Sequence, residues 1–287
     1  MIQHEIWTTL KVLTWTKEFL ASKGVENARL EAEWLLCAAT GLDRVGLYLQ
    51  FDKPLNDDEL AAYREMVARR AKREPLQHIL GNQEFCGLDY DVSPDVLIPR
   101  HDTEILITQA AALMPDGRTL LDIGTGSGCI AVSLAAHYPN AIVTATDISA
   151  AALNMARRNI EKHNVTVETL LGSLFEPVAD RSFDLILSNP PYIPTKDIAG
   201  LEPEVRDYDP LGALDGGADG LDIYRILVPE AKSHLNPGGW LLLEVGSGQA
   251  ADVTEIFNRT GGYSEPCTTL DTGGRERVVA AQRKGPQ

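Results

Sequence analysis

An apolar run from Phe183 to Ser188 has the length of a β-strand and stops at Asn189-Pro190-Pro191-Tyr192, a sequence that cannot continue a sheet. Each proline fixes its own φ and lacks an N–H, and each pushes the preceding residue towards extended geometry. The pattern predicts a stiff turn at the carboxyl end of a buried strand, where open α/β sheets bind their ligands. Asn-Pro pairs also mark ordinary turns, so the tetrapeptide alone leaves both interpretations open.

The same turn gathers groups that suit one kind of ligand. Asn189 carries a side-chain amide, Pro190 offers a backbone carbonyl with few competing donors, and Tyr192 carries an aromatic ring. Such a set can hold a planar NH2 group by two hydrogen bonds and one stacked face.

Strands and helices alternate around this turn. We expect strands at 119–123, 141–146, 165–171, 183–188 and 240–245, and helices at 129–137, 149–163, 221–235 and 250–260. Two last segments, 265–270 and 277–281, are close enough in sequence to pair as an antiparallel edge. A long loop rich in Pro, Gly and acidic residues is expected from 193 to 220, and loops of this length are usually functional or disordered. The alternation predicts an α/β fold, a doubly wound sheet with helices on both faces.

A different pattern precedes the alternating part. Residues 1–78 read as a small helical domain, in which Asn56 and Glu59 form a capping box. Its basic cluster at 69–73 is expected to complement a helix C-terminus, in preference to forming a nucleic-acid patch. Residues 79–99 suggest a hairpin linker, and residues 100–287 form the domain that carries the chemistry. Thr103 and Asp102 either cap the helix that follows them or face a cleft; the sequence does not choose.

A glycine-rich turn follows the first strand of the alternating part. It reads Asp122-Ile-Gly-Thr-Gly-Ser-Gly128, and Cys129 stands where a dinucleotide fingerprint has its third glycine. Asp147 ends the second strand, where a carboxylate can accept both hydroxyls of a ribose. The pattern predicts an adenosine site. No Lys or Arg lies in the turn to meet a pyrophosphate, which favours S-adenosylmethionine over a dinucleotide.

Composition narrows the setting of this site. A net charge of -15 argues against a broad basic surface for phosphate backbones. The four cysteines are scattered and the six histidines form no cluster, which predicts buried free thiols, a reducing compartment and no metal site. No signal segment opens the chain, and no apolar run approaches ~18 residues. We therefore expect a cytoplasmic protein with no membrane association.

Five motifs resemble one known family. They are Ile-Pro-Arg (98–100), Asp-Ile-Gly-Thr-Gly-Ser-Gly (122–128), Asn-Pro-Pro-Tyr-Ile (189–193), Glu-Val-Gly-Ser-Gly-Gln (244–249) and Asp271 with Arg277. Together they resemble the release-factor glutamine N5-methyltransferases, the HemK family, over almost the whole chain. The resemblance implies a seven-stranded class I methyltransferase fold, Rossmann-like, with a small helical N-terminal domain joined by a β-hairpin. It also implies S-adenosylmethionine as cofactor and a role in translation termination.

The resemblance assigns roles to individual residues. The substrate would be the glutamine of the Gly-Gly-Gln motif in class 1 peptide chain release factors, bound at Asn189, Pro190, Pro191 and Tyr192. The cofactor would be held by Gly124, Thr125, Gly126, Ser127, Gly128 and Asp147, with Asn189 beside it. Ser173 stands where many relatives carry an acidic residue, so Leu174 is expected to give the adenine a hydrophobic face.

The residues at the turn suit this chemistry. If the Asn189 oxygen and the Pro190 carbonyl accept the two amide hydrogens, they orient the nitrogen lone pair and stabilise the charge that develops on nitrogen. Tyr192 would stack on the amide and exclude water. The remaining contribution is in-line positioning, and no general base is required.

Two other functions remain open at this stage. A DNA adenine N6-methyltransferase needs the same grip on an NH2 group, but also phosphate contacts and a target-recognition module, and the acidic chain supplies neither. A non-catalytic adenosine-binding module would not need the Asn-Pro-Pro-Tyr turn. The helical domain is expected to recognise the protein substrate, and the oligomeric state is left unknown.

Overall fold

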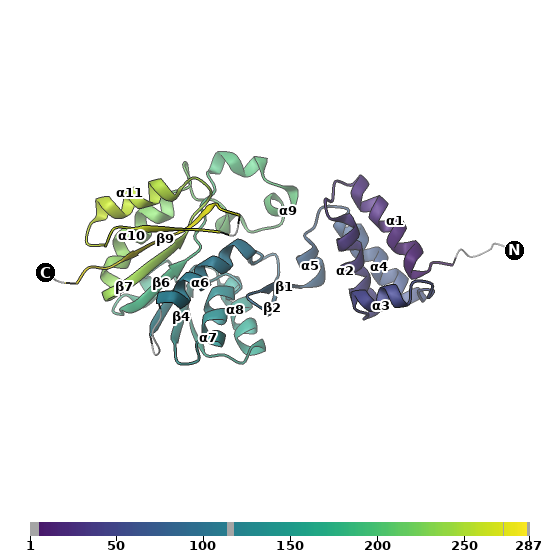
Figure 1. The fold of residues 1–287 in the computed structure, drawn as a ribbon, viewed down its shortest axis with the longest axis horizontal. Coiled ribbons are helices and arrows are strands. Elements are labelled where there is room, and N and C mark those ends of the chain that lie inside the picture. Colours follow the sequence, from purple (N-terminus) through teal and green to yellow (C-terminus); the bar gives the residue numbers. More distant parts are fainter. Residues whose placement is uncertain (1–5, 114–117, 272, 286–287) are drawn as a thin grey trace. The chain divides into compact units, whose positions relative to one another are not determined.

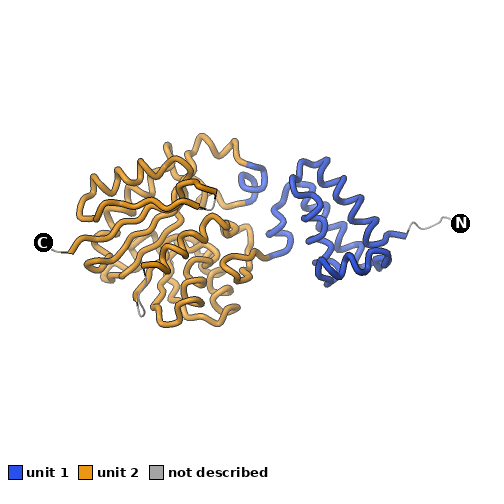
Figure 2. The backbone as a smooth tube through the Cα atoms, in the orientation of Figure 1, with its two compact units in different colours: residues 1–81, 202–208 blue, residues 82–201, 209–287 orange. Residues whose placement is uncertain are grey.

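The computed structural model describes residues 6–113, 118–271 and 273–285. The chain forms two compact units, coloured separately in Figure 2. Unit 1 comprises residues 1–81 and 202–208, and unit 2 comprises residues 82–201 and 209–287. A short segment from the long predicted loop therefore belongs to the helical unit, which the sequence did not indicate.

Unit 1 is built from helices. Their bounds are α1 Thr9–Ser22, α2 Ala28–Thr40, α3 Arg44–Leu49, α4 Asp57–Arg70, α5 Leu76–Leu80 and α9 Pro203–Arg206. The predicted capping box is confirmed: the Asn56 side chain accepts from the Glu59 N–H, and the Glu59 side chain accepts from the Asn56 N–H. Helix α2 ends at Gly41, which adopts the left-handed conformation with φ of +71°.

The basic cluster after α4 forms specific ion pairs inside unit 1. Arg70 is only 4% exposed, and its Nη2 lies 2.9 Å from Oε1 of Glu204. Arg73 donates to both oxygens of the same carboxylate at 2.6 Å, and Arg69 pairs with Glu74. Burial acts to raise the pKa of Glu204, but hydrogen bonds from Arg73 and Arg70 outweigh it and the pKa is lowered. The prediction that this cluster complements the C-terminus of α4 is therefore incomplete. Arg70 and Arg73 also bind Glu204 and so hold the segment 202–208 in unit 1.

Unit 2 opens with a two-stranded hairpin, β1 Asn82–Phe85 and β2 Leu88–Asp91, as predicted. The buried side chains of Phe85 and Tyr90 join the same core as α6 (Glu104–Leu113) and α7 (Cys129–His137). The Tyr90 hydroxyl lies 2.7 Å from the Ser133 hydroxyl of α7. The hairpin is thus packed onto a helix of unit 2.

A seven-stranded sheet forms the centre of unit 2 (Figure 1). Its strands are β3 Thr119–Ile123, β4 Ile142–Asp147, β5 Val167–Leu171, β6 Phe183–Ser188, β7 Leu235–Glu244, β8 Cys267–Leu270 and β9 Glu276–Gln282. Their order is β5-β4-β3-β6-β7-β9-β8; the first five are parallel, and β9 pairs antiparallel with β7 and β8. The predicted α/β class, seven strands and antiparallel edge are confirmed.

Alternate residues of the central strands enter cores on opposite faces of the sheet. Leu120 and Leu185 lie in the core shared with α6 and α7. Leu121 and Ile186 lie in the core shared with α10 (Asp222–His234) and α11 (Ala250–Thr260). Burial on both faces explains why these strands read as continuous apolar runs. Helix α8 (Ala150–Lys162) follows its N-cap residue Ser149, whose hydroxyl accepts from the Ala152 N–H.

Three details differ from the sequence-based expectation. Strand β7 begins at Leu235 and not at Trp240, because Leu235 already pairs with Phe183 across a bulge. The loop 193–220 contains short helices, η3 Thr195–Gly200 and η4 Leu211–Ala213 besides α9. All four cysteines are free, as predicted, but only Cys129 is buried: Cys37 and Cys86 are half-buried, and Cys267 on the outer strand is exposed. In the described parts of the chain, no helix is both long and apolar enough to cross a bilayer.

The ion pairs of Glu204 give a stability prediction. Glu204→Gln removes the charge that Arg70 and Arg73 share, so we expect a loss of about 1.5–3 kcal/mol in the free energy of unfolding of unit 1. Glu202→Gln is the matched control, because Glu202 is 75% exposed and its one pair is 3.3 Å long; surface pairs contribute about 0–1 kcal/mol. Urea unfolding followed by tryptophan fluorescence measures both, in a Trp240→Phe background that leaves Trp7, Trp15 and Trp34 of unit 1 as reporters. Equal losses would contradict a structural role for Glu204.

Candidate active site

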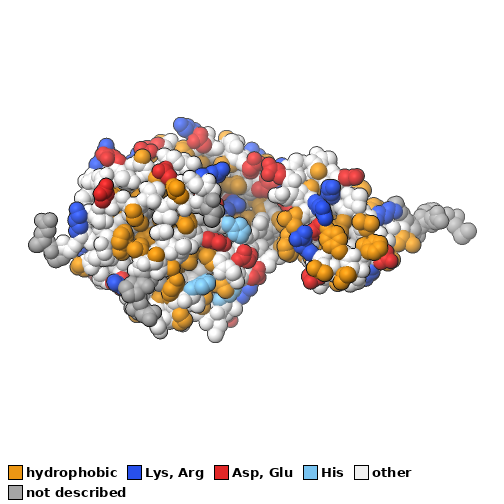
Figure 3. Space-filling view, in the orientation of Figure 1, with side chains coloured by type: hydrophobic (Ala, Val, Ile, Leu, Met, Phe, Trp, Pro, Cys, Tyr) orange, Lys and Arg blue, Asp and Glu red, His pale blue; other side chains and the backbone are white. Residues whose placement is uncertain are grey.

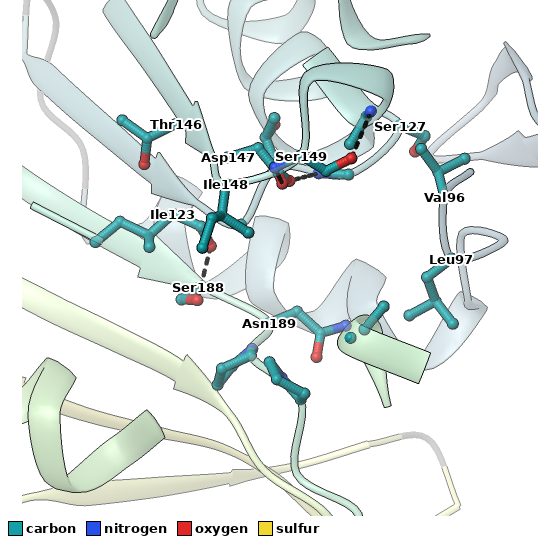
Figure 4. A pocket seen from close by; sticks show the side chains of 18 of the residues that line it. Val96, Leu97, Ile123, Ser127, Thr146, Asp147, Ile148, Ser149, Ser188 and Asn189 are labelled. Carbon is teal, nitrogen blue, oxygen red and sulfur yellow. Dashed lines mark hydrogen bonds between the residues drawn. The ribbon is translucent and has the colours of Figure 1, made fainter. Parts of the chain in front are cut away.

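A cavity of about 360 Å³ opens at the carboxyl ends of the parallel strands of unit 2 (Figure 4). Its position follows from the strand register, which aligns Ile123 of β3 with Thr146 of β4 and with Ser188 of β6. The residues that come next along each strand are Gly124, Asp147 and Asn189. The three sequence motifs predicted separately therefore meet at one edge of the sheet.

The glycine-rich loop supplies backbone to this cavity. Gly124 and Gly126 have φ of +72° and +56°, and a Cβ atom added to either would meet no protein atom within 4 Å. Their open side faces the space that a ligand would fill. Gly128 favours glycine for a different reason: a Cβ there would lie 3.1 Å from the side chain of Ala156 on α8. Thr125 and Ser127 also line the cavity.

Two acidic side chains support the loop from below. Asp147 lines the cavity, and its carboxylate accepts from the Gly126 N–H at 2.9 Å and from the Ser149 N–H at 2.8 Å. Each oxygen keeps a lone pair for a ligand hydroxyl. Asp122 is fully buried and accepts from the Thr125 hydroxyl at 2.6 Å. Burial raises the pKa of Asp122 to about 7.

Apolar side chains complete this half of the cavity. Leu174 lines it and also packs against the core below the sheet. Ile148, which follows Asp147 directly, is 75% exposed and lies at the same wall. Ile148 was missed, although an exposed apolar residue after a strand-ending acid is a usable signal. The two side chains are placed to give a flat ring hydrophobic contact.

Asn189 and the two prolines form the opposite wall. The Asn189 amide nitrogen donates to the Thr103 hydroxyl at 3.1 Å, and Asn189, Pro190 and Pro191 all line the cavity. Figure 4 shows Asn189 at the end of β6, beyond Ser188, whose hydroxyl bonds to the Ile123 carbonyl. Of the two readings left open for Thr103, the structure supports the one that faces a cleft.

Neighbouring segments fix the position of this turn. The Gln249 side chain donates to the Tyr192 carbonyl at 2.9 Å and accepts from the Gly246 N–H at 2.9 Å. A Cβ added to Gly216 would lie 2.8 Å from the Pro191 carbonyl oxygen, and one added to Gly220 would lie 2.3 Å from the Tyr192 carbonyl oxygen. The turn is therefore packed against the backbone of Gly216 and Gly220 and is also held by the hydrogen bond from the Gln249 side chain.

Tyr192 occupies a different place from the rest of the tetrapeptide. Its ring packs against the core below the sheet and close to Gly246, and burial raises its pKa to about 12. Among the residues described for the cavity wall, Asn189, Pro190 and Pro191 are present and Tyr192 is not.

A buried carboxyl group lies behind Asn189. Glu244, at the end of β7, is 1% exposed. Burial raises its pKa to about 7, although Thr103, Arg277 and Asn189 each act in the opposite direction. Arg277 is in turn paired with Asp102 at 2.9 Å and with Asp271 at 3.2 Å. Glu244, Gln249 and Arg277 appeared in the sequence only as parts of motifs, because their roles depend on contacts between distant segments.

The long loop contributes the remaining wall. Asp209 has a fully buried side chain, and its Oδ2 lies 2.6 Å from Nη2 of Arg100. Burial raises the pKa of Asp209, and the Arg100 charge opposes that shift. Next to this pair, Pro210, Gly212 and Ala213 line the cavity.

Among the described residues, one group of side chains of the types that can bind a metal ion lies elsewhere in unit 2. Glu84, His101 and Glu104 bring one ligand atom each within 4.8 Å of one another. Both carboxylates accept from backbone at the hairpin turn: Glu84 from the Gly87 N–H at 2.6 Å, and Glu104 from the Cys86 N–H at 3.1 Å. These contacts give the group a structural role in closing the turn.

The packing of the Asn-Pro-Pro-Tyr turn gives a second stability prediction. Gly220→Ala would strain a residue with φ of +79° and would also push the Tyr192 carbonyl and Gln249 away. Gly87→Ala is the control, because Gly87 has a similar φ of +75° and no atom within 4 Å of the added Cβ. We expect the control to lose about 1–2 kcal/mol and Gly220→Ala to lose clearly more, measured by thermal unfolding. Equal losses would show that the turn is not tightly packed.

Comparisons with known proteins agree with this geometry. Residues 11–81 match the PrmC N-terminal domain, and residues 101–200 match the methyltransferase small domain. The release factor glutamine methyltransferase of Geobacter sulfurreducens is 60% identical over 278 residues, which cover 97% of this chain and 98% of that protein. The protein of the same name from Moorella thermoacetica is 43% identical over 269 residues, or 92% of this chain and 95% of its own length. The crystal structure of a methyltransferase from Pyrococcus furiosus aligns with a TM-score of 0.53 at 26% identity, covering 70% of this chain and 91% of that chain.

The fold, the domain order and the full-length similarity point the same way. The class I methyltransferase fold expected from the motifs is confirmed by the seven-stranded sheet and the structural neighbour. The similarity runs through both units and is not confined to the common methyltransferase core. The chain belongs to the release factor glutamine methyltransferase family.

Proposed function

We propose that the protein transfers a methyl group from S-adenosylmethionine to the side-chain amide N5 of the Gly-Gly-Gln glutamine in class 1 peptide chain release factors. Family membership supports the reaction, the cofactor and the substrate class. The observation that carries the site assignment is the placement of Gly124, Asp147 and Asn189 at one edge of the sheet, around one cavity.

The cavity wall fits the cofactor. Asp147 keeps acceptor capacity for the ribose hydroxyls, Gly124 and Gly126 leave room for close backbone approach, and Leu174 with Ile148 offers a face for the adenine. Thr125, Ser127 and Gly128 shape the loop. When bound, S-adenosylmethionine supplies an electrophilic methyl group on a sulfonium.

Asn189 and Pro190 are the proposed catalytic residues. Because the Asn189 nitrogen donates to Thr103, its oxygen would accept one hydrogen of the substrate NH2, and the Pro190 carbonyl would accept the second. An amide nitrogen is a poor nucleophile, so holding both hydrogens orients its lone pair and stabilises the developing positive charge. The rigid turn supplies the in-line position.

Tyr192 is the third proposed catalytic residue, as a face against which the substrate amide stacks. Its ring now packs beside Gly246, so this role requires the ring to be uncovered towards Pro191 when the glutamine enters. The same core position would also let the ring keep water away from the reacting nitrogen.

We further propose that residues 1–78 recognise the release factor, that residues 79–99 link the two parts, and that residues 100–287 carry out methyl transfer. A protein acceptor is favoured over duplex DNA because the net charge of -15 repels phosphate. A release factor substrate places the enzyme in the cytoplasm with the translation machinery.

The ribose contact can be tested by calorimetry. Asp147→Ala should weaken binding of S-adenosylmethionine by roughly 10- to 150-fold, the equivalent of one or two charge-assisted hydrogen bonds. Asp180→Ala, which removes an exposed carboxylate away from the cavity, should leave the affinity unchanged. Unchanged affinity in Asp147→Ala would remove Asp147 from the cofactor site.

The acceptor can be tested with labelled cofactor. Purified release factor and adenine-containing duplex DNA are compared at low salt, the condition most favourable to DNA, using wild-type protein and Asn189→Ala. We expect label on the release factor glutamine alone, and a fall of roughly 10²-fold or more in Asn189→Ala with cofactor affinity nearly kept. Label in DNA, or on another release factor residue, would contradict the proposed function.

A further inference from the structure

We propose that Glu244 is a positioning residue, which acts through Thr103 to fix the orientation of the Asn189 amide so that its oxygen, and not its nitrogen, faces the substrate. The inference rests on the proposed role of Asn189 and adds the group that determines its polarity.

The orientation of Asn189 matters because its two ends have opposite hydrogen-bonding character. The oxygen accepts and the NH2 group donates, so a flipped amide would present donors to the two hydrogens of the substrate NH2. The structure pairs the Asn189 nitrogen with the Thr103 hydroxyl at 3.1 Å. A hydroxyl alone cannot enforce that choice, because it can donate as well as accept.

Glu244 removes this ambiguity. The strand register aligns Ser188 with Leu243, so Glu244, at the end of β7, lies beside Asn189. Its carboxyl group is almost completely buried, and hydrogen bonding by the Thr103 and Asn189 side chains acts to lower its pKa. An ionised carboxylate only accepts, so it takes the Thr103 O–H. The Thr103 oxygen is then left to accept from Asn189. The charge of the Glu244 carboxylate thus sets the direction of both hydrogen bonds, from Thr103 to Glu244 and from Asn189 to Thr103.

Backbone contacts hold Glu244 in place. Its carbonyl accepts from the buried Tyr224 hydroxyl at 2.6 Å, and its own strand pairs Glu244 with Val278 of β9. One carboxyl oxygen, Oε2, has no hydrogen-bond partner among the described residues. A buried acceptor with spare capacity, next to a hydroxyl that must donate, is what the relay requires.

The charge of Glu244 depends on its surroundings. The titratable and charged groups that act on it come from four elements and the Asn-Pro-Pro-Tyr turn: Asp102 of η1 (His101–Thr103), Cys129 of α7, Tyr192 of the turn, Tyr224 of α10 and Arg277 of β9. Burial raises the pKa of Glu244 to about 7, Arg277 lowers it and Asp102 raises it. Below that pH the protonated carboxyl can donate to Thr103, and the relay can reverse.

The test measures kcat, the KM for purified release factor and the affinity for S-adenosylmethionine between pH 5.5 and 9. Wild-type kcat should fall as the pH drops through about 7. Glu244→Gln can both donate and accept, so its kcat should be roughly 10- to 100-fold lower and lack this acid limb. Cofactor affinity should be unchanged. Wild-type kcat with an intact acid limb in Glu244→Gln would overturn the inference.

Further variants separate the relay from a packing effect. Thr103→Val removes the hydroxyl and should lower kcat as Glu244→Gln does. Thr103→Ser keeps the hydroxyl and should have a kcat close to that of the wild type. Asp102→Asn removes a charge that raises the pKa of Glu244, so the acid limb should move to lower pH. An unmoved limb, or an inactive Thr103→Ser beside an active Thr103→Val, would overturn the inference.

Asn189→Ala, assayed in parallel, distinguishes a failure of the proposed role of Asn189 from a failure of the relay. If Asn189→Ala retains turnover, the proposed role of Asn189 fails and the relay fails with it. If Asn189→Ala loses turnover but Glu244→Gln does not, only the relay fails.

Discussion

The alignment of three parallel strand ends is the constraint on which the site depends. Because Ile123 pairs with Thr146 and with Ser188, the loop glycine, the acid and the amide that follow them must leave the sheet side by side. Shifting a strand by one residue would exchange the faces that its side chains cover, so the two apolar cores that bury the strands also hold this register. The chemistry at the edge is thus positioned by hydrophobic packing on both faces of the sheet.

Two buried acids lie just below this edge. Asp122 binds Thr125 under the glycine loop, and Glu244 lies behind Thr103 and Asn189. The pKa of each is raised to about 7 by burial. Between the unfolded-state pKa, about 4, and about 7, the folded chain therefore holds more protons than the unfolded chain, and stability falls as the pH rises. The ionised forms that suit the site are destabilising for the fold, and the surrounding packing has to offset that cost.

Much of this arrangement could be predicted from residue patterns. Strands β3 and β6 and helices α7 and α11 begin and end where apolar runs, glycines and prolines indicate, because these elements are specified by local sequence. Contacts between distant segments could not be read in the same way. The attachment of residues 202–208 to unit 1 depends on the ion pair between Glu204 and Arg70. The hydrogen bond from Gln249 depends on Tyr192, which lies more than fifty residues earlier in the chain. Leu235 entered a strand for the same reason, since its partner Phe183 outweighs the local signal of Asn-Pro-Gly-Gly.

The most direct test is a crystal structure of the protein with S-adenosylhomocysteine and a glutamine peptide that carries the Gly-Gly-Gln sequence. We expect the glutamine amide nitrogen to lie within about 2.7–3.2 Å of both the Asn189 side-chain oxygen and the Pro190 carbonyl oxygen. Asn189 should still donate to Thr103, and the nitrogen of the bound glutamine should face the sulfur of S-adenosylhomocysteine. A glutamine bound with its nitrogen away from Asn189, or an Asn189 amide that turns its nitrogen towards the substrate, would contradict the account.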